Sequence, residues 1–114
     1  MKKTGIFAAA ILTAILSTTS LADEPQVLQE IRANCAAEWA DDFVMQDYCI
    51  KQQVEALITF NEDFYDLARE NAVIGGIVGR CAVEWPGKVA GFDYVMVLYC
   101  VQQQVEAYNR LQGG

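Results

Sequence analysis

Cys35-Ala36-Ala37-Glu38-Trp39, followed by Asp42-Phe43-Val44-Met45 and Tyr48-Cys49, is the stretch that decides the fold, because the chain repeats it. The second copy reads Cys81-Ala82-Val83-Glu84-Trp85, Asp93-Tyr94-Val95-Met96 and Tyr99-Cys100. Both copies continue into Gln-Gln-Val-Glu-Ala, at positions 52–56 and 103–107. The four cysteines occupy matching places, so the repeat predicts a structural unit and a disulfide pairing. It predicts no activity.

Apolar side chains at three- and four-residue spacing indicate one face of a helix in each copy. These side chains are Leu28, Ile31, Cys35 and Trp39 in the first copy and Ile74, Ile77, Cys81 and Trp85 in the second. Asp42 and Asp93 precede the next periodic runs, where a short carboxylate can cap a helix N-terminus. Each copy is therefore predicted to be a helix, a short turn and an antiparallel helix.

These units define an all-α fold of two disulfide-linked antiparallel helical hairpins joined by a short connecting helix. The first hairpin is expected at about 25–60 and the second at about 72–111. The polar, helix-compatible stretch at about 61–71 supplies the connector.

Facing helices would bring Cys35 close to Cys49, and Cys81 close to Cys100, within the distance that a disulfide requires. The within-repeat pairing is preferred, but a cross-repeat pairing of Cys35 with Cys100 and Cys49 with Cys81 stays open. The spacing lacks the close cysteine pairs of zinc sites, so no metal and no cofactor are expected.

Residues 1–22 are typical of a secretory signal peptide. Lys2 and Lys3 form the charged start, residues 6–16 the apolar stretch, and Ser20-Leu21-Ala22 the cleavage site. The apolar stretch is too short to cross a bilayer. We therefore expect a single all-α domain at 23–114, no stable membrane span after cleavage, and a periplasmic or secreted location. Disulfides are common in small exported domains of this kind.

The chain is acidic, with 8 Lys and Arg against 15 Asp and Glu and a net charge of −7. Loss of Lys2 and Lys3 on cleavage would make it more acidic still. Such a surface repels phosphates, so no nucleic-acid binding is expected, whereas a basic partner is favoured.

The residue types argue against catalysis. The chain has no histidine, which removes the commonest general base. Thr59 is the only serine or threonine after residue 22. Glu38 and Glu84 could in principle form a glycosidase-like carboxylate pair. They are more simply explained as helix-surface residues, and we predict that the protein is not an enzyme.

The repeated aromatic and amide residues have structural explanations. Two tryptophans and two tyrosines next to the cysteines resemble a stacking site for sugars or peptides, but their repetition favours packing around each disulfide: Trp39, Trp85, Tyr48 and Tyr99. The paired glutamines at 52–53 and 103–104 adjoin a buried face, so their amides are expected to satisfy backbone groups at helix ends.

The two copies differ in polarity. Positions that hold polar residues in the first copy hold apolar residues or glycine in the second, which makes its helices apolar on nearly all sides. Either the second hairpin is the centre of the domain or it contacts another molecule, through an interface containing Val78, Val97 and Leu98. Gly75-Gly76-x-x-Gly79 is expected to let a neighbouring backbone approach closely.

The string Cys-x-x-Glu-Trp…Asp-Phe-x-Met-x-x-Tyr-Cys-Ile-x-x-Gln resembles a motif in a family of small exported bacterial proteins that has no assigned function. The likeness covers residues 35–57 and, more loosely, 81–108. The first copy has Ala40 where the motif usually has proline. The second copy keeps Pro86 but inserts residues 87–91. The resemblance supports the unit and implies no mechanism.

These observations predict an exported, disulfide-stabilised helical module with a protein–protein interaction or structural role in the bacterial envelope. Its partner would be another protein or a second copy of the chain. The alternative is a carrier or chaperone-like binder of apolar ligands or unfolded chains.

Overall fold

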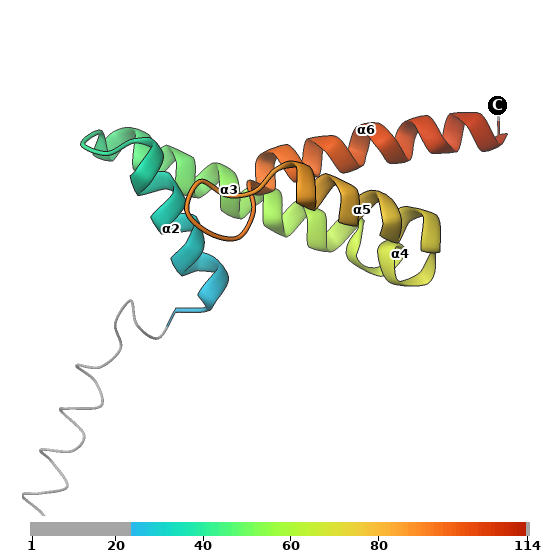
Figure 1. Cartoon of the computed structure of the whole chain (residues 1–114), viewed down its shortest axis with the longest axis horizontal. Helices are drawn as coiled ribbons and strands as arrows, with labels where there is room; N and C mark the ends of the chain where they lie inside the picture. Colours follow the sequence, from blue (N-terminus) through green and yellow to red (C-terminus); the bar gives the residue numbers. More distant parts are fainter. Residues whose placement is uncertain (1–23, 114) are drawn as a thin grey trace, which may run out of the picture.

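The computed structural model describes residues 24–113, which are mostly helical and contain no strand beyond an isolated bridge between Pro86 and Phe92. The signal peptide predicted at 1–22 lies outside the described residues. Figure 1 shows the order of the helices, which are α2 (Gln26–Glu38), α3 (Phe43–Asp63), α4 (Tyr65–Glu70), α5 (Ala72–Glu84) and α6 (Tyr94–Gly113). The all-α prediction is confirmed.

Both within-repeat disulfides are present, and the cross-repeat alternative is wrong. Cys35 of α2 is bonded to Cys49 of α3, with 5.7 Å between their Cα atoms. Cys81 of α5 is bonded to Cys100 of α6, also with a Cα separation of 5.7 Å. Each bridge closes a short loop and contributes about 3 kcal/mol in the chain-entropy estimate.

The predicted aspartate caps are also confirmed. Asp42 Oδ1 accepts a hydrogen bond from the Met45 N–H at 3.1 Å, at the start of α3. Asp93 Oδ1 accepts one from the Met96 N–H at 3.2 Å, at the start of α6. Each carboxylate therefore satisfies a backbone donor that has no partner within its own helix.

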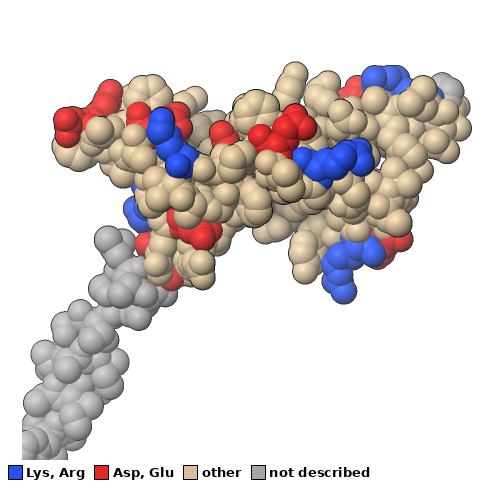
Figure 2. All heavy atoms as spheres, viewed as in Figure 1, with Lys and Arg blue, Asp and Glu red and all other residues tan. Residues whose placement is uncertain are grey.

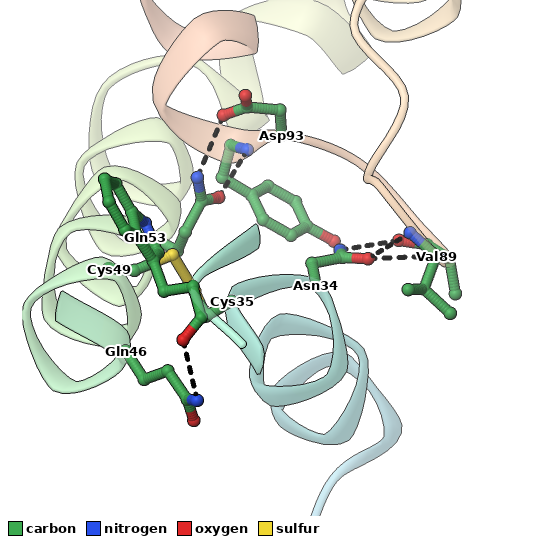
Figure 3. The surroundings of a disulfide bond; sticks show 10 residues. Asn34, Cys35, Gln46, Cys49, Gln53, Val89 and Asp93 are labelled. Carbon is green, nitrogen blue, oxygen red and sulfur yellow. Dashed lines mark hydrogen bonds between the residues drawn. A yellow bond between two sulfur atoms is a disulfide. The ribbon is translucent and has the colours of Figure 1, made fainter. Parts of the chain in front are cut away.

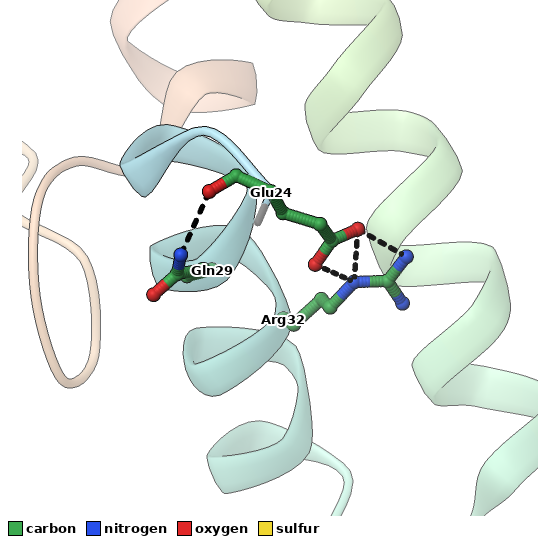
Figure 4. A network of polar contacts seen from close by, with 3 residues as sticks. All are labelled: Glu24, Gln29 and Arg32. Carbon is green, nitrogen blue, oxygen red and sulfur yellow. Dashed lines mark hydrogen bonds and ion pairs between the residues drawn. The ribbon is translucent and has the colours of Figure 1, made fainter. Parts of the chain in front are cut away.

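The start of α2 is held by a different device, shown in Figure 4. The Glu24 carboxylate pairs with the Arg32 guanidinium at 3.0 Å, while the Gln29 amide donates to the Glu24 carbonyl at 2.7 Å. The hydrogen bond between the Arg32 and Glu24 side chains, together with the charge of Glu24, raises the pKa of Arg32. The Arg32 side chain is 47% exposed and that of Glu24 is 19% exposed, so water screens the pair and its contribution to stability is small.

The short helix α4 lies where the connector was expected and packs tightly on α5. A Cβ atom on Gly75 would lie 2.8 Å from the Ala68 carbonyl oxygen, so only glycine permits this approach. A Cβ on Gly76 would meet only the flexible end of Arg80, and one on Gly79 would meet open space. The expectation of close packing is therefore confirmed at Gly75 alone.

The main core is built from the second copy, with Phe64 at the end of α3. Its buried members are Phe64, Ile74, Ile77, Cys81, Val97, Val101 and Val105. α6 packs against both α3 and α5, and it runs past them toward the C-terminus in Figure 1. The greater apolarity of the second copy thus serves internal packing first. None of the helices within 24–113 combines the length and apolarity needed to cross a membrane.

Candidate binding cleft

Gln53 of α3 connects the disulfide-bonded helices α2 and α3 to the start of α6, as Figure 3 shows. Its Nε2 donates to Asp93 Oδ1 at 2.9 Å, and its Oε1 accepts from the Tyr94 N–H at 2.7 Å. A single side chain thus orients the capping carboxylate and satisfies a further free donor of the helix. The prediction that these amides serve helix ends is confirmed for Gln53. Gln46 does the same for α2 by donating to the Trp39 and Ala40 carbonyls at 3.0 and 2.8 Å.

Asn34 of α2 holds the loop between α5 and α6 (Figure 3). Its Oδ1 accepts from the N–H groups of Val89 and Ala90 at 2.7 and 3.0 Å, and its Nδ2 donates to the Ala90 carbonyl at 2.7 Å. These three bonds join residues more than fifty positions apart. They fix the loop that carries Phe92 to the surface of α3.

The loop itself depends on two glycines. Gly91 has a φ of 61°, a left-handed conformation that other residues adopt only at a cost. A Cβ on Gly87 would overlap the Ala90 carbonyl oxygen and the Asn34 amide. The Gly87 N–H donates to the Gly91 carbonyl at 2.9 Å and closes the turn. The loop is therefore a built support for the residues that follow it.

An apolar cleft of about 250 Å³ lies between α3, α5 and the start of α6. Its lining contains no charged side chain and is formed by Leu57, Phe60, Asn61, Tyr65, Val78, Ala82, Phe92, Tyr94 and Val97. Tyr65 and Phe92 are 51% and 41% exposed, so aromatic rings form its rim. Because Gln53 and Asn34 fix Tyr94 and the loop before Phe92, their hydrogen bonds also shape the cleft.

The lining of the cleft includes two tyrosines and one asparagine. Burial, and to a lesser degree the charge of Glu30, raise the pKa of Tyr94, so its hydroxyl stays neutral well into the alkaline range. The Arg69 guanidinium lies 5.6 Å from the centre of the Tyr65 ring, at the rim. Such a site can hold an apolar group, and the polar residues in its lining are Asn61, Tyr65 and Tyr94.

The cleft brings together two of the three predicted interface residues. Val78 and Val97 both line it, although Val97 is only 6% exposed and belongs mainly to the core. Leu98 does not line it and packs, partly buried, against the core. The interface therefore stays a prediction, carried by Val78 and the aromatic rim. Phe92 and Tyr65 were missed because their place depends on the loop and on α4, for which the repeat offers no guide.

The residues considered for chemistry are not assembled into a site. Glu38 and Glu84 line different surface hollows, one at the turn after α2 and one on α5. All four cysteines are in disulfides, and no cluster of three potential metal ligands occurs among residues 24–113. The half-buried Thr59 lines none of the hollows named above.

The aromatic residues beside the cysteines divide in their burial. Trp39 and Trp85 are half-buried, and Trp85 packs against the core as expected. Tyr48 and Tyr99 are 56% and 58% exposed, so their rings are less covered than the expected packing around the disulfides implies. Tyr48 lines a surface hollow together with Trp39 and Cys49.

Figure 2 shows that broad uncharged areas separate small groups of charged side chains on the face drawn there. No family model matches the chain, and no curated protein or solved structure matches it either. The case for a function therefore depends on the cleft and on the exposed apolar surface.

Proposed function

We propose that the protein is an exported binding module whose cleft between α3, α5 and α6 receives an apolar side chain of a partner protein. The observation that carries this proposal is the lining, which is uncharged and rimmed by exposed aromatic rings. Pockets that anchor one bulky side chain, surrounded by contacts that exclude water, dominate the binding energy of many protein interfaces.

The size of the cleft favours a side chain over a whole lipid. An apolar cavity of about 150 Å³ holds a benzene-sized molecule, whereas sites for larger ligands measure roughly 300–1,000 Å³. At about 250 Å³ the cleft suits one aromatic or branched side chain. The partner segment would also carry lysine or arginine, because the chain has a net charge of −7 and Glu62, Asp63 and Asp66 are exposed close in sequence to the cleft residues Asn61 and Tyr65.

A carrier of apolar ligands is the second candidate, and the same apolar lining supports it. A fatty acyl chain could enter with its end alone, leaving most of its length outside. The two candidates therefore differ in what a purified sample retains.

We place this module in the bacterial envelope or outside the cell, as two antiparallel helical hairpins that each carry their own disulfide. Disulfides are typical of oxidising compartments. The predicted signal peptide and the resemblance to small exported bacterial proteins support this location and the hairpin unit. Fractionation of cells that express the full chain, with N-terminal sequencing of the product, tests export and cleavage before Asp23.

Binding is tested by titrating the oxidised protein with a short peptide that has one tryptophan between lysines, monitored by two-dimensional NMR. Shifts are expected at Val78, Phe92 and Tyr94. The variant Ala82→Trp fills the cleft and should abolish them. Val83→Trp is the matched control, because Val83 is the next residue on α5 and is 82% exposed, so binding should persist.

Shifts that map elsewhere, or that persist in Ala82→Trp, would contradict the proposed cleft. A glutamate-flanked peptide should bind more weakly, and equal binding would remove the argument from charge. Native mass spectrometry of the same sample tests the second candidate. A retained fatty acid that Ala82→Trp excludes would establish the carrier instead.

A further inference from the structure

The chain contains an internal docking contact between its two copies. On α3, Gln53 holds Asp93 and the Tyr94 N–H, while Leu57 and Phe60 line the cleft with Val97. One face of the first copy thus receives the beginning of the α6 helix. Aligning the repeated Gln-Gln-Val-Glu-Ala strings carries these three α3 positions to Gln104, Tyr108 and Leu111 of α6.

On α6, Gln104 and Leu111 continue a buried stripe into the open, while Tyr108 between them packs, partly buried, against the core. Val97, Val101, Gln104, Tyr108 and Leu111 follow alternating steps of four and three, the spacing of a helix-packing seam. Val97 and Val101 are 6% and 0% exposed, whereas Gln104 is exposed and Leu111 is 84% exposed. α3 packs against α6 but ends at Asp63, so it does not cover the last two turns of α6.

The opposite end of the molecule presents the complementary surface. Asp42 and Phe43 correspond to Asp93 and Tyr94, and Asp42 caps its helix in the same way. No hydrogen bond within residues 24–113 uses the Phe43 N–H, although Gln53 satisfies the Tyr94 N–H. Phe43 and its neighbour Val44 are 74% and 78% exposed.

From this recurrence we infer that a second copy of the chain docks head to tail on α6. Gln104 of one copy holds the Asp42 carboxylate and the Phe43 N–H of the next, and the Phe43 ring covers Leu111. The contact continues the packing seam already used inside the chain. Because its two surfaces differ, it is heterologous and extends into a chain of copies or closes a ring.

The intermolecular contact is weaker than its internal counterpart. Arg80 occupies the position that corresponds to Asn34, so the three hydrogen bonds that Asn34 makes to the loop have no counterpart in the intermolecular contact. Gln46 occupies the position that corresponds to Val97, and its amide already donates to the Trp39 and Ala40 carbonyls. Small interfaces of this kind give weak association, with a Kd on the order of 100 µM.

Sedimentation equilibrium of the oxidised protein, from about 5 µM to about 1 mM, tests the inference across that range. The wild-type average mass should rise steadily with concentration. Phe43→Ser removes one surface, and Leu111→Ser combined with Gln104→Ala removes the other. Each variant alone should stay monomeric. Gln103→Ala, at the adjacent exposed amide, should behave as wild type. Far-UV circular dichroism confirms folding of each variant, since all the substituted side chains are exposed.

Mixing the two defective variants separates this geometry from a symmetric dimer. Each retains the surface that the other lacks, so an equimolar mixture should form one-to-one dimers and nothing larger. A wild-type protein that stays monomeric to 1 mM would overturn the inference, as would variants that associate like wild type or a mixture that does not dimerise. Ala82→Trp should leave assembly unchanged, because the cleft is a separate surface.

Discussion

Replacement of Gln53 by alanine is expected to cost about 2 kcal/mol of unfolding free energy. The side chain makes two hydrogen bonds, to the Asp93 carboxylate at 2.9 Å and from the Tyr94 N–H at 2.7 Å. A neutral bond contributes about 1 kcal/mol and one to a charged group about 1.5–3 kcal/mol. The site is half-buried, so water recovers part of the loss.

Thermal and urea unfolding of the oxidised protein, followed by circular dichroism at low micromolar concentration, measures this change. For a domain of this size the loss corresponds to a fall in Tm of about 8–16 °C. Gln104→Ala is the matched control at the equivalent exposed position of the second copy, and it should change stability by less than about 0.5 kcal/mol. Equal effects of the two substitutions would refute the reasoning.

A charged variant gives the same contact a pH signature. Gln53→Glu places a second carboxylate against Asp93, and this like charge raises the pKa of the introduced glutamate in the folded state. The penalty is present above that raised pKa and is relieved as the pH falls through it, so the variant should regain stability below about pH 5. Wild-type protein should show no such recovery.

Three further substitutions test the loop and the cleft. Asn34→Ala removes all three hydrogen bonds to the loop, so it should lower the unfolding free energy by about 2 kcal/mol and speed proteolysis of the loop. Arg80→Ala, at the corresponding exposed position of the second copy, should do neither. Gly87→Ala should lower the unfolding free energy, measured in urea, by more than about 2 kcal/mol, because the added Cβ has no room. Gly79→Ala, on the open surface of α5, should instead stabilise the protein by about 0.5–1 kcal/mol. The opposite order of the two effects would contradict the loop geometry. Burial raises the pKa of Tyr94, so above about pH 10 this phenol ionises in the unfolded chain before it does in the folded protein. Stability should therefore fall as the pH rises above that value, and Tyr94→Phe should flatten the fall.

The repeat carried most of what could be predicted about the fold. The cysteine pairs and the two aspartate caps depend on positions close in sequence, where helix periodicity determines geometry. Even the role of the Gln53 amide followed from its place beside a buried face. Local chemistry of this kind is the part of structure that a single sequence expresses most directly.

The relation between the two copies was not predictable in the same way. The Asn34 contact joins an unremarkable helix residue to an inserted loop, and no periodic signal connects them. The exposure of Tyr48 and Tyr99 was also missed, because repetition beside a cysteine does not say which side of a helix is covered. The cleft depends on that tertiary arrangement and so could not be predicted from the sequence.

Each sulfur bridge joins a cysteine to the next one along the chain, at separations of 14 and 19 residues. In a chain that crosses a membrane from its N-terminus, the first pair would emerge together before either later thiol arrives. Oxidation in order of emergence then produces the native linkages directly. Maturation would need an oxidant but no isomerase, and it would avoid the seconds-to-hours reshuffling that non-consecutive cysteines impose.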